Sequence, residues 1–333
     1  MMLRYVVPVE FEVYGEGLDE GALTSAFAFK RLNVDVRLAS GEKPYTMDID
    51  GRSVQTLTID HLSISIDDRS DNSLTNLVRS SQWDGVLKTL LRVANSCISH
   101  IRDTGGVPHV HTITTSGRED ARFVLHNFGV QISEDGTTWR DIIEKSELYP
   151  DARRYLVQLM VSKPKGWLSL SRWASVKSSL ASGVDPDVAA QCTVNAQEYL
   201  ELGNLRLAVL ESVMGLELSM ASYLSEYGRR KLHMSKDQIE TMLAPTVTLE
   251  IRLKCLLPFC QGDQALPDES LKKVVAVVRW RNAIVHELGG LPTGISPDMA
   301  TSYIQEIILV VEWLRSQVRK METASPPITQ RQP

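Results

Sequence analysis

Apolar and polar residues alternate along the first fifth of the chain. Every second position from Val7 to Val13 is apolar, while Glu10 and Glu12 fall between them. This period of two is typical of a strand with one buried face. The same alternation returns in two later segments, residues 27–38 and 54–66. Residues 3–66 are therefore expected to form strands joined by Gly-rich turns.

The following segment predicts a mixed structure. One helix is expected over residues 74–102, ending at the Asp-Thr-Gly-Gly sequence of 103–106, a strong helix breaker. Two more strands are expected, over residues 107–115 and 122–132. The Glu-Asp-Gly sequence at 134–136 suits a tight turn. Residues 1–150 are thus predicted to be an α+β module dominated by antiparallel strands.

The second half of the chain carries helical patterns throughout. Residues 151–185 are expected to be a helical connector, and Asp185 is a candidate N-cap with Pro186 at the first helical position. Breakers separate the later helices, which are expected from 186 to the Gly203-Asn204 break and over residues 205–227, 246–257, 269–288 and 298–320. The overall prediction is an α+β chain: a β-rich module, then an all-α bundle over 186–320. A disordered tail is expected at 321–333.

Composition narrows the class of protein. The chain has 333 residues, of which 43% are hydrophobic and 23% charged, and a formal net charge of −5. It therefore has no global basic field to attract nucleic acid, and an RNA partner would need a local site. The N-terminus does not resemble a signal peptide, and no apolar run is long enough to cross a bilayer. Four scattered cysteines without C-x2-C spacing favour reduced thiols and a cytoplasmic protein.

One polar group interrupts the apolar face of the helix expected at 269–288. At about 100° per residue, Arg281 falls on the stripe of Val274, Val278 and Val285. A buried guanidinium is costly without a carboxylate, a partner subunit or a phosphate. Asn282 and His286, spaced i and i+4, lie on the neighbouring stripe, at the border of the core face. These three side chains predict a polar cleft.

The Arg-Asn-x3-His sequence at 281–286 resembles the signature of HEPN ribonucleases. The segment from Ala196 to Glu217 also resembles the first helical hairpin of these families, through its cadence A-x-x-Y-L-x-x-G-N-x-x-x-A-V … L-E. The resemblance covers about the last 135 residues of the chain. The looser spacing Arg-x6-His also occurs from Arg279 to His286, so it is the tighter form, with Asn directly after Arg, that favours Arg281.

The resemblance implies a metal-independent endoribonuclease without a cofactor. In such enzymes an RNA 2′-hydroxyl attacks the adjacent phosphodiester and leaves a 2′,3′-cyclic phosphate and a 5′-hydroxyl. His286 would serve as acid or base, Arg281 would clamp the phosphate and Asn282 would orient either group. The family also implies a homodimer through the C-terminal helices, because one subunit offers one imidazole while cleavage needs an acid and a base. By analogy, it implies a defence or toxin system.

Several alternatives remain open. Arg281 would serve structure alone if it paired with Glu211 or Glu217, and His286 if it capped the last turn of its helix. A catalytically silent HEPN-like module that dimerises and binds nucleotide or protein is the main alternative function. The pair His109 and His111 has no carboxylate cluster nearby, so we expect no metal site there. The basic residues of 153–154 and 163–165 form a local cluster, which is usually a solvated face but which RNA could contact. No motif indicates the role of residues 1–150, for which a protein or small-ligand partner is expected.

Overall fold

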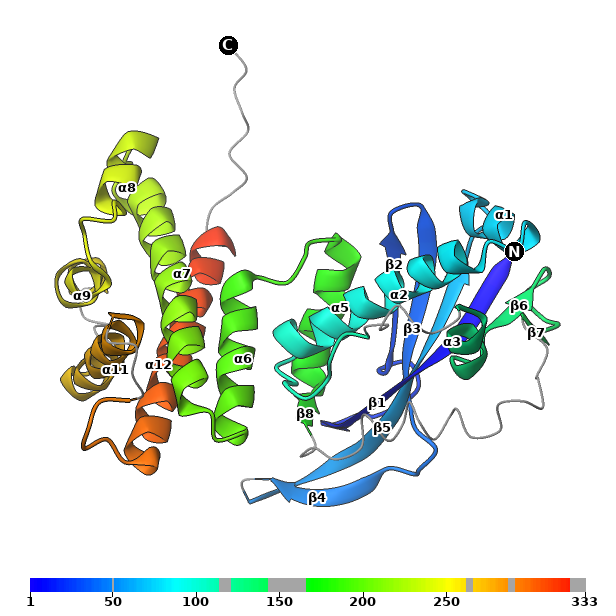
Figure 1. Cartoon of the computed structure of the whole chain (residues 1–333), viewed down its shortest axis with the longest axis horizontal. Coiled ribbons are helices and arrows are strands. Elements are labelled where there is room, and N and C mark those ends of the chain that lie inside the picture. Colours follow the sequence, from blue (N-terminus) through cyan, green and yellow to red (C-terminus); the bar gives the residue numbers. More distant parts are fainter. Residues whose placement is uncertain (50, 114–120, 143–165, 262–265, 287–290, 324–333) are drawn as a thin grey trace, which may run out of the picture. The chain divides into compact units, whose positions relative to one another are not determined.

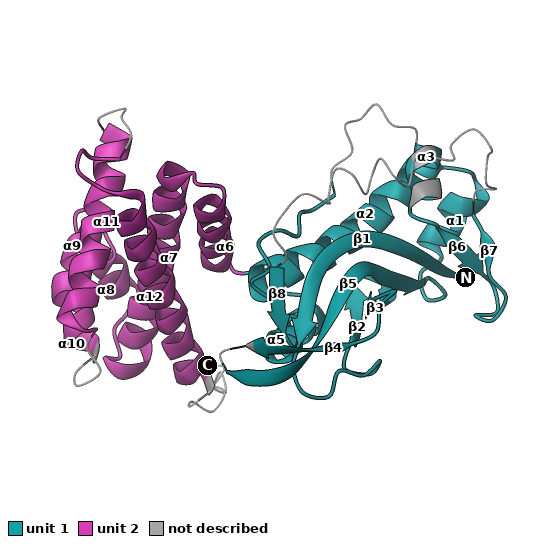
Figure 2. Ribbon diagram, turned by 90° about the horizontal axis from the view of Figure 1, so that it is seen from below, with its two compact units in different colours: residues 1–186 teal, residues 187–333 magenta. Residues whose placement is uncertain are grey.

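The structure is a computed structural model of the whole chain. It describes residues 1–49, 51–113, 121–142, 166–261, 266–286 and 291–323. The chain divides into two compact units, Met1–Pro186 and Asp187–Pro333 (Figure 2). Each unit has its own cluster of buried apolar side chains. The first unit is built on a largely antiparallel sheet and the second is helical, which confirms the α+β prediction.

The first unit, called the sheet unit below, contains an eight-stranded sheet (Figure 1). Its strands are β1 (Met2–Tyr14), β2 (Thr24–Phe29), β3 (Leu32–Ala39), β4 (Tyr45–Ile49), β5 (Arg52–Asp67), β6 (Gln131–Ser133), β7 (Arg140–Asp141) and β8 (Gly166–Ser169). The order is β2-β3-β5-β1-β6-β7, with β4 also paired to β5 and β8 to β1. Only the β1–β8 pair is parallel among these pairings.

The alternation predicted for the first strand is confirmed. Alternate positions of β1 from Leu3 to Val13 are buried on one face. A register shift between Pro8 and Phe11 marks a bulge in the pairing with β5. Glu12, expected on the polar face, is instead buried, at the point where β8 pairs with β1 opposite Trp167. An added strand on the far side of β1 therefore covers a position that alternation alone assigns to solvent.

The strand predicted over 27–38 is wrong as a single element. The chain turns back at Lys30 and Arg31, and the two halves form the antiparallel hairpin of β2 and β3, with Phe29 opposite Leu32. Lys30 adopts φ 56°, the left-handed conformation that a two-residue hairpin turn needs. Neither residue of this turn is a Gly or Asn, the residues that usually indicate a hairpin turn in a sequence. The alternation of apolar and polar residues therefore continues through the turn, and the sequence does not reveal it.

The helix expected after the first strands is interrupted in the structure. The described helices of the sheet unit are α1 (Ser73–Arg79), α2 (Trp83–Ser99), the π-helical turn η1 (His100–Thr104), α3 (Ala121–Asn127) and α5 (Leu170–Ser182). The helix expected over 74–102 is broken between α1 and α2, where Ser81 has φ 56°. Asn72, before α1, also has a left-handed φ, of 55°. Asparagine is one of the residues that tolerate this conformation, whereas Ser81 gives no comparable signal in the sequence.

The two strands expected over 107–115 and 122–132 are also wrong. Residues 107–113 form turns and irregular backbone, and 114–120 lie outside the described residues. Most of the second segment is helix α3, followed by the short strand β6. Ala121, Val124, Leu125 and Phe128 are buried together. This spacing of three and four is helical, and the run of β-branched and aromatic residues obscured it.

The segment expected as a connector contributes to the sheet unit. Residues 151–165 lie outside the described residues, while 166–182 form β8 and α5. The indole Nε1 of Trp173 donates to the Ala22 carbonyl at 2.9 Å, and its side chain is fully buried. The boundary between the units falls after Pro186.

The second unit, called the helical unit below, is a bundle of helices. They are α6 (Val188–Glu201), α7 (Leu205–Lys231), α8 (Lys236–Met242), α9 (Leu249–Ile251), the π-helical turn η2 (Arg252–Leu256), α10 (Leu257–Gln261), α11 (Asp268–His286) and α12 (Pro297–Thr323). Asp187, and not the expected Asp185, caps α6, because its side chain accepts from the Ala189 amide. Helix α8 was not expected, and it begins at Ser235 with a capping box. Of the predicted tail, residues 324–333 lie outside the described residues.

Helix α7 forms the centre of the helical unit. It packs against α6, α11 and α12. Among the described helices it alone is long and apolar enough to cross a membrane by length and composition. However, 56% of its most apolar window is buried inside the unit. This burial is what the core helix of a soluble bundle would show.

Candidate functional site

Helix α11 carries all three predicted site residues, and its packing fixes their positions. Val274, Val277 and Val278 are buried in the core of the helical unit. Trp280 stacks on Tyr303 of α12, with ring centroids 5.4 Å apart and planes within 6°. Such contacts lock the rotation of α11 about its axis, so the stripe on which each later residue falls is determined.

Arg281 lies where the apolar stripe leaves the core. Val274 and Val278 on this stripe are buried, Arg281 is half-buried, and Val285 is 46% exposed. The guanidinium donates to the side-chain oxygen of Asn282 at 3.2 Å. In the described part of the chain, no ion pair involves Arg281. A cation held by a neutral amide keeps its full charge for another partner.

Arg279, two residues earlier on the same helix, is placed differently. It donates to Glu250 of α9 at 2.7 Å, and Lys254 donates to the same carboxylate. The hydrogen bonds from Arg279 and Lys254 lower the pKa of Glu250 to about 2. The charge of Arg279 is therefore matched within the helical unit. Arg279, the arginine of the loose Arg-x6-His spacing, is therefore paired with a carboxylate. Arg281, the arginine of the tighter Arg-Asn-x3-His motif, is not paired with one among the described residues.

Asn282 and His286 are both exposed on the last turns of α11. Four residues on a helix differ by about 40° in direction and about 6 Å in height, so the two side chains share one stripe. His286 is the last residue of α11 that the structure describes, and residues 287–290 lie outside the described part. The structure thus brings Arg281 and Asn282 into direct contact and places His286 one turn beyond Asn282, open to solvent.

The carboxylates proposed as structural partners of Arg281 do not pair with it in the described structure. Glu211 accepts instead from the amide of Asn195 on α6, at 3.1 Å. No ion pair joins Arg281 to Glu217 among the described residues. The alternative that His286 only caps the last turn of α11 stays open. The helix dipole favours a cation at that position whatever the partner of Arg281 is.

The other sequence candidates gain little from the structure. His109 and His111 lie on irregular backbone and not on a strand. The described residues contain no group of three or more His, Cys, Asp or Glu placed to hold a metal ion. The basic residues of 153–154 and 163–165 lie outside the described residues.

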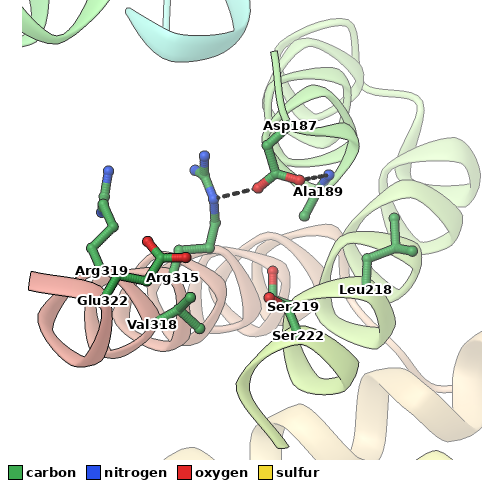
Figure 3. A pocket seen from close by; sticks show the side chains of 9 residues that line it. All are labelled: Asp187, Ala189, Leu218, Ser219, Ser222, Arg315, Val318, Arg319 and Glu322. Carbon is green, nitrogen blue, oxygen red and sulfur yellow. Dashed lines mark hydrogen bonds and ion pairs between the residues drawn. The ribbon is translucent and has the colours of Figure 1, made fainter. Parts of the chain in front are cut away.

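Sequence reasoning missed a pocket in the helical unit, lined by residues of α7 and α12 and by Asp187 at the start of α6 (Figure 3). Its polar residues Asp187, Ser219 and Arg315 are up to 128 positions apart in the chain. No local spacing marks them, so only the packing of the three helices could reveal them.

Comparison with protein-family models, with curated proteins and with solved structures found no match to this chain. The case for a function therefore rests on the residues themselves.

Proposed function

We propose that the chain is a metal-independent endoribonuclease whose site is formed by Arg281, Asn282 and His286. The observation that carries this proposal is the state of Arg281. It is half-buried at the end of an apolar stripe, bound to a neutral amide, and without an ion pair among the described residues. A phosphate is the partner that a planar, unmatched guanidinium suits best. The exposed imidazole of His286 lies about 7.5 Å further along the same helix.

The three side chains have separate tasks in this reaction. A neutral imidazole takes the proton from the 2′-hydroxyl as its oxygen bonds to the adjacent phosphorus. The bond from phosphorus to the 5′ oxygen then breaks, and an imidazolium gives that oxygen a proton. The Arg281 guanidinium neutralises the charge that builds on the non-bridging oxygens. The hydrogen bond to Asn282 holds one nitrogen of the fork and leaves the others for the phosphate.

One imidazole cannot be acid and base at once, so we propose a homodimer in which His286 of the partner subunit takes the second task. The exposed Val285, next to His286, suits a surface that a second subunit covers. Sedimentation at micromolar concentration should show a dimer. A monomer alone would exclude the two-subunit site.

We further propose that the protein acts in the cytoplasm, where RNA and reduced thiols are found. All four cysteines are free, and Cys97 and Cys192 are buried. In this proposal the sheet unit senses a signal or binds a partner and has no part in cleavage. A fragment spanning residues 1–186 should therefore fold and leave RNA intact. Cleavage by that fragment would contradict this division.

The reaction is tested with two RNA strands that differ at one position. A labelled strand is incubated with the protein in EDTA, and the cleaved site is located. A second strand carries a 2′-deoxynucleotide on the 5′ side of that bond. The proposal predicts a 2′,3′-cyclic phosphate from the first strand and no cleavage at this bond in the second. Cleavage of both strands, or activity that EDTA abolishes, would exclude the proposed reaction.

A further inference from the structure

The pocket in the helical unit has features of a second binding site. It lies between the start of α6, helix α7 and helix α12, and has a volume of about 260 Å³ (Figure 3). Its polar wall comes from Asp187, Ser219, Ser222, Arg315, Arg319 and Glu322. Every residue that lines it belongs to the helical unit.

Ser219 is a buried hydroxyl without a protein partner. The residue is 2% exposed, and its Oγ makes no hydrogen bond within the described part of the chain. Ser212, two turns earlier on α7, is equally buried, but its Oγ donates to the Val209 carbonyl at 3.0 Å. Buried polar atoms are almost always hydrogen-bonded. Because Ser219 lines the pocket, its hydroxyl is an unpaired polar group at the wall of that space.

Arg315 is held in place by Asp187. Its Nε donates to one carboxylate oxygen at 2.9 Å, and the other oxygen accepts from the Ala189 amide at 3.1 Å. Figure 3 shows this chain of contacts at the pocket wall. Asp187 is thus engaged through both oxygens, while the two terminal nitrogens of Arg315 have no partner among the described residues. Only 25% of the Arg315 side chain is exposed, so a ligand meets an oriented, partly desolvated fork.

Donors outnumber acceptors in the polar lining of this pocket, because Asp187 is engaged through both oxygens and Glu322 is the other carboxylate there. The Arg315 fork and the hydroxyls of Ser219 and Ser222 suit a compact anion with several acceptor oxygens, and Arg319 adds a second cation to the lining. Leu218 and Val318 provide an apolar wall. The volume lies below the range of about 300–1,000 Å³ that drug-sized ligands need, so the ligand is small. We propose that the pocket binds a small organic phosphate, with its phosphate on Arg315 and Ser219 and its short carbon part against Leu218 and Val318.

This proposal does not rest on the ribonuclease. Trp280 of α11 stacks on Tyr303 of α12, and Lys273, further back on α11, lies 4.0 Å from Glu306. The two helices are therefore antiparallel, and the end of α11 points away from Arg315. Arg315 is twelve residues beyond Tyr303, which is about 18 Å along α12. The pocket and the α11 site are thus separate places in the helical unit.

The test is calorimetric titration of the full chain with inorganic phosphate and with glycerol 3-phosphate, at constant ionic strength. Sodium chloride and sodium acetate are the reference ligands. Both phosphates should bind, glycerol 3-phosphate more tightly, and neither reference should. Wild-type protein that takes up neither phosphate more strongly than chloride would overturn the proposal, and equal binding of acetate would overturn the choice of phosphate.

Matched variants place the ligand in the pocket. Ser219→Ala should weaken phosphate binding about tenfold to hundredfold, the range for a hydrogen bond to a charged group. Ser212→Ala, the same change on the same helix outside the pocket, should bind as wild type. Arg315→Lys keeps the charge but loses the fork, and should weaken binding by a similar factor. Thermal melts check that each variant is folded. Wild-type affinity in Ser219→Ala or in Arg315→Lys would overturn the proposal.

Discussion

Tyr5 and His100 of the sheet unit are bonded in a different way from Ser219 and Arg281 of the helical unit. In the sheet unit, Tyr5 donates its hydroxyl to the Leu90 carbonyl at 2.9 Å, and burial raises its pKa well above its usual range. The His100 ring contacts the carbonyls of Ser96 and Val184. Among the described residues, by contrast, Ser219 of the helical unit has no partner and Arg281 has only a neutral one, Asn282.

We propose that this difference separates side chains that stabilise the fold from side chains that bind a ligand. A buried polar side chain tied to distant backbone stabilises the tertiary structure, and its loss leaves a partner unsatisfied. A side chain without such ties can be changed at little cost to stability. Substitutions of these two kinds of residue should therefore differ in whether they lower stability or function.

The largest expected effect is on the stability of the sheet unit. Trp173→Ala removes a fully buried indole and its hydrogen bond to Ala22, and should cost about 3–5 kcal/mol of unfolding free energy. Hydrogen exchange should show the loss in the sheet unit and not in the helical unit. Trp167→Ala, at a residue 39% exposed, is the matched control and should cost much less. Equal losses of stability in the two variants would contradict the assignment of α5 to the core of the sheet unit.

A smaller effect, on rate and not on stability, is expected at Arg281. Arg281→Lys keeps the charge but loses the planar fork, and should slow RNA cleavage about hundredfold, or about 2.7 kcal/mol of transition-state free energy. Arg279→Lys is the matched control on the same helix, because Arg279 is already paired with Glu250. Single-turnover rates of both variants decide the point. If the control loses as much rate as Arg281→Lys, Arg281 has no special role.

The smallest effect is expected at Glu250. Glu250→Gln removes the ion pairs to Arg279 and Lys254, and should cost less than about 1 kcal/mol because the pairs are near the surface. The pKa of Glu250 is lowered from 4.5 to about 2, so its carboxylate stabilises the folded state at neutral pH and loses this effect as pH falls from about 4.5 toward 2. Denaturation of both forms at pH 7 and pH 2.5 should show the difference shrinking. A difference that grows on acidification would contradict this assignment.

Part of the fold could be predicted from the sequence because local pattern and packing agree there. The alternation in β1 and the helical period of α7 each reflect one buried face of the element. The breakers around α11 mark the ends of that helix. Prediction failed where a turn or break had no marker. The Lys30-Arg31 turn lies inside an unbroken alternation, and Ser81 interrupts a good helical pattern.

The candidate site shows the same limit. The position of Arg281 on an apolar stripe could be predicted from spacing on one helix, and so could the shared stripe of Asn282 and His286. That Glu250 pairs with Arg279, 29 positions away, depends on the packing of α9 against α11 and could not be predicted. The pocket at Ser219 and Arg315 depends on three helices and has no local signature at all.

The central claim is that His286 and its neighbours cleave RNA, and one comparison tests it most directly. Wild type, His286→Ala and His233→Asn are incubated with the same labelled RNA in EDTA. His233 is a matched control: it is an exposed histidine of the helical unit, and asparagine tolerates its left-handed φ of 53°. We predict cleavage by wild type and His233→Asn, and a loss of about 10²–10⁴-fold in His286→Ala with an unchanged melting temperature. Equal cleavage by His286→Ala, or no cleavage by wild type, would contradict the account.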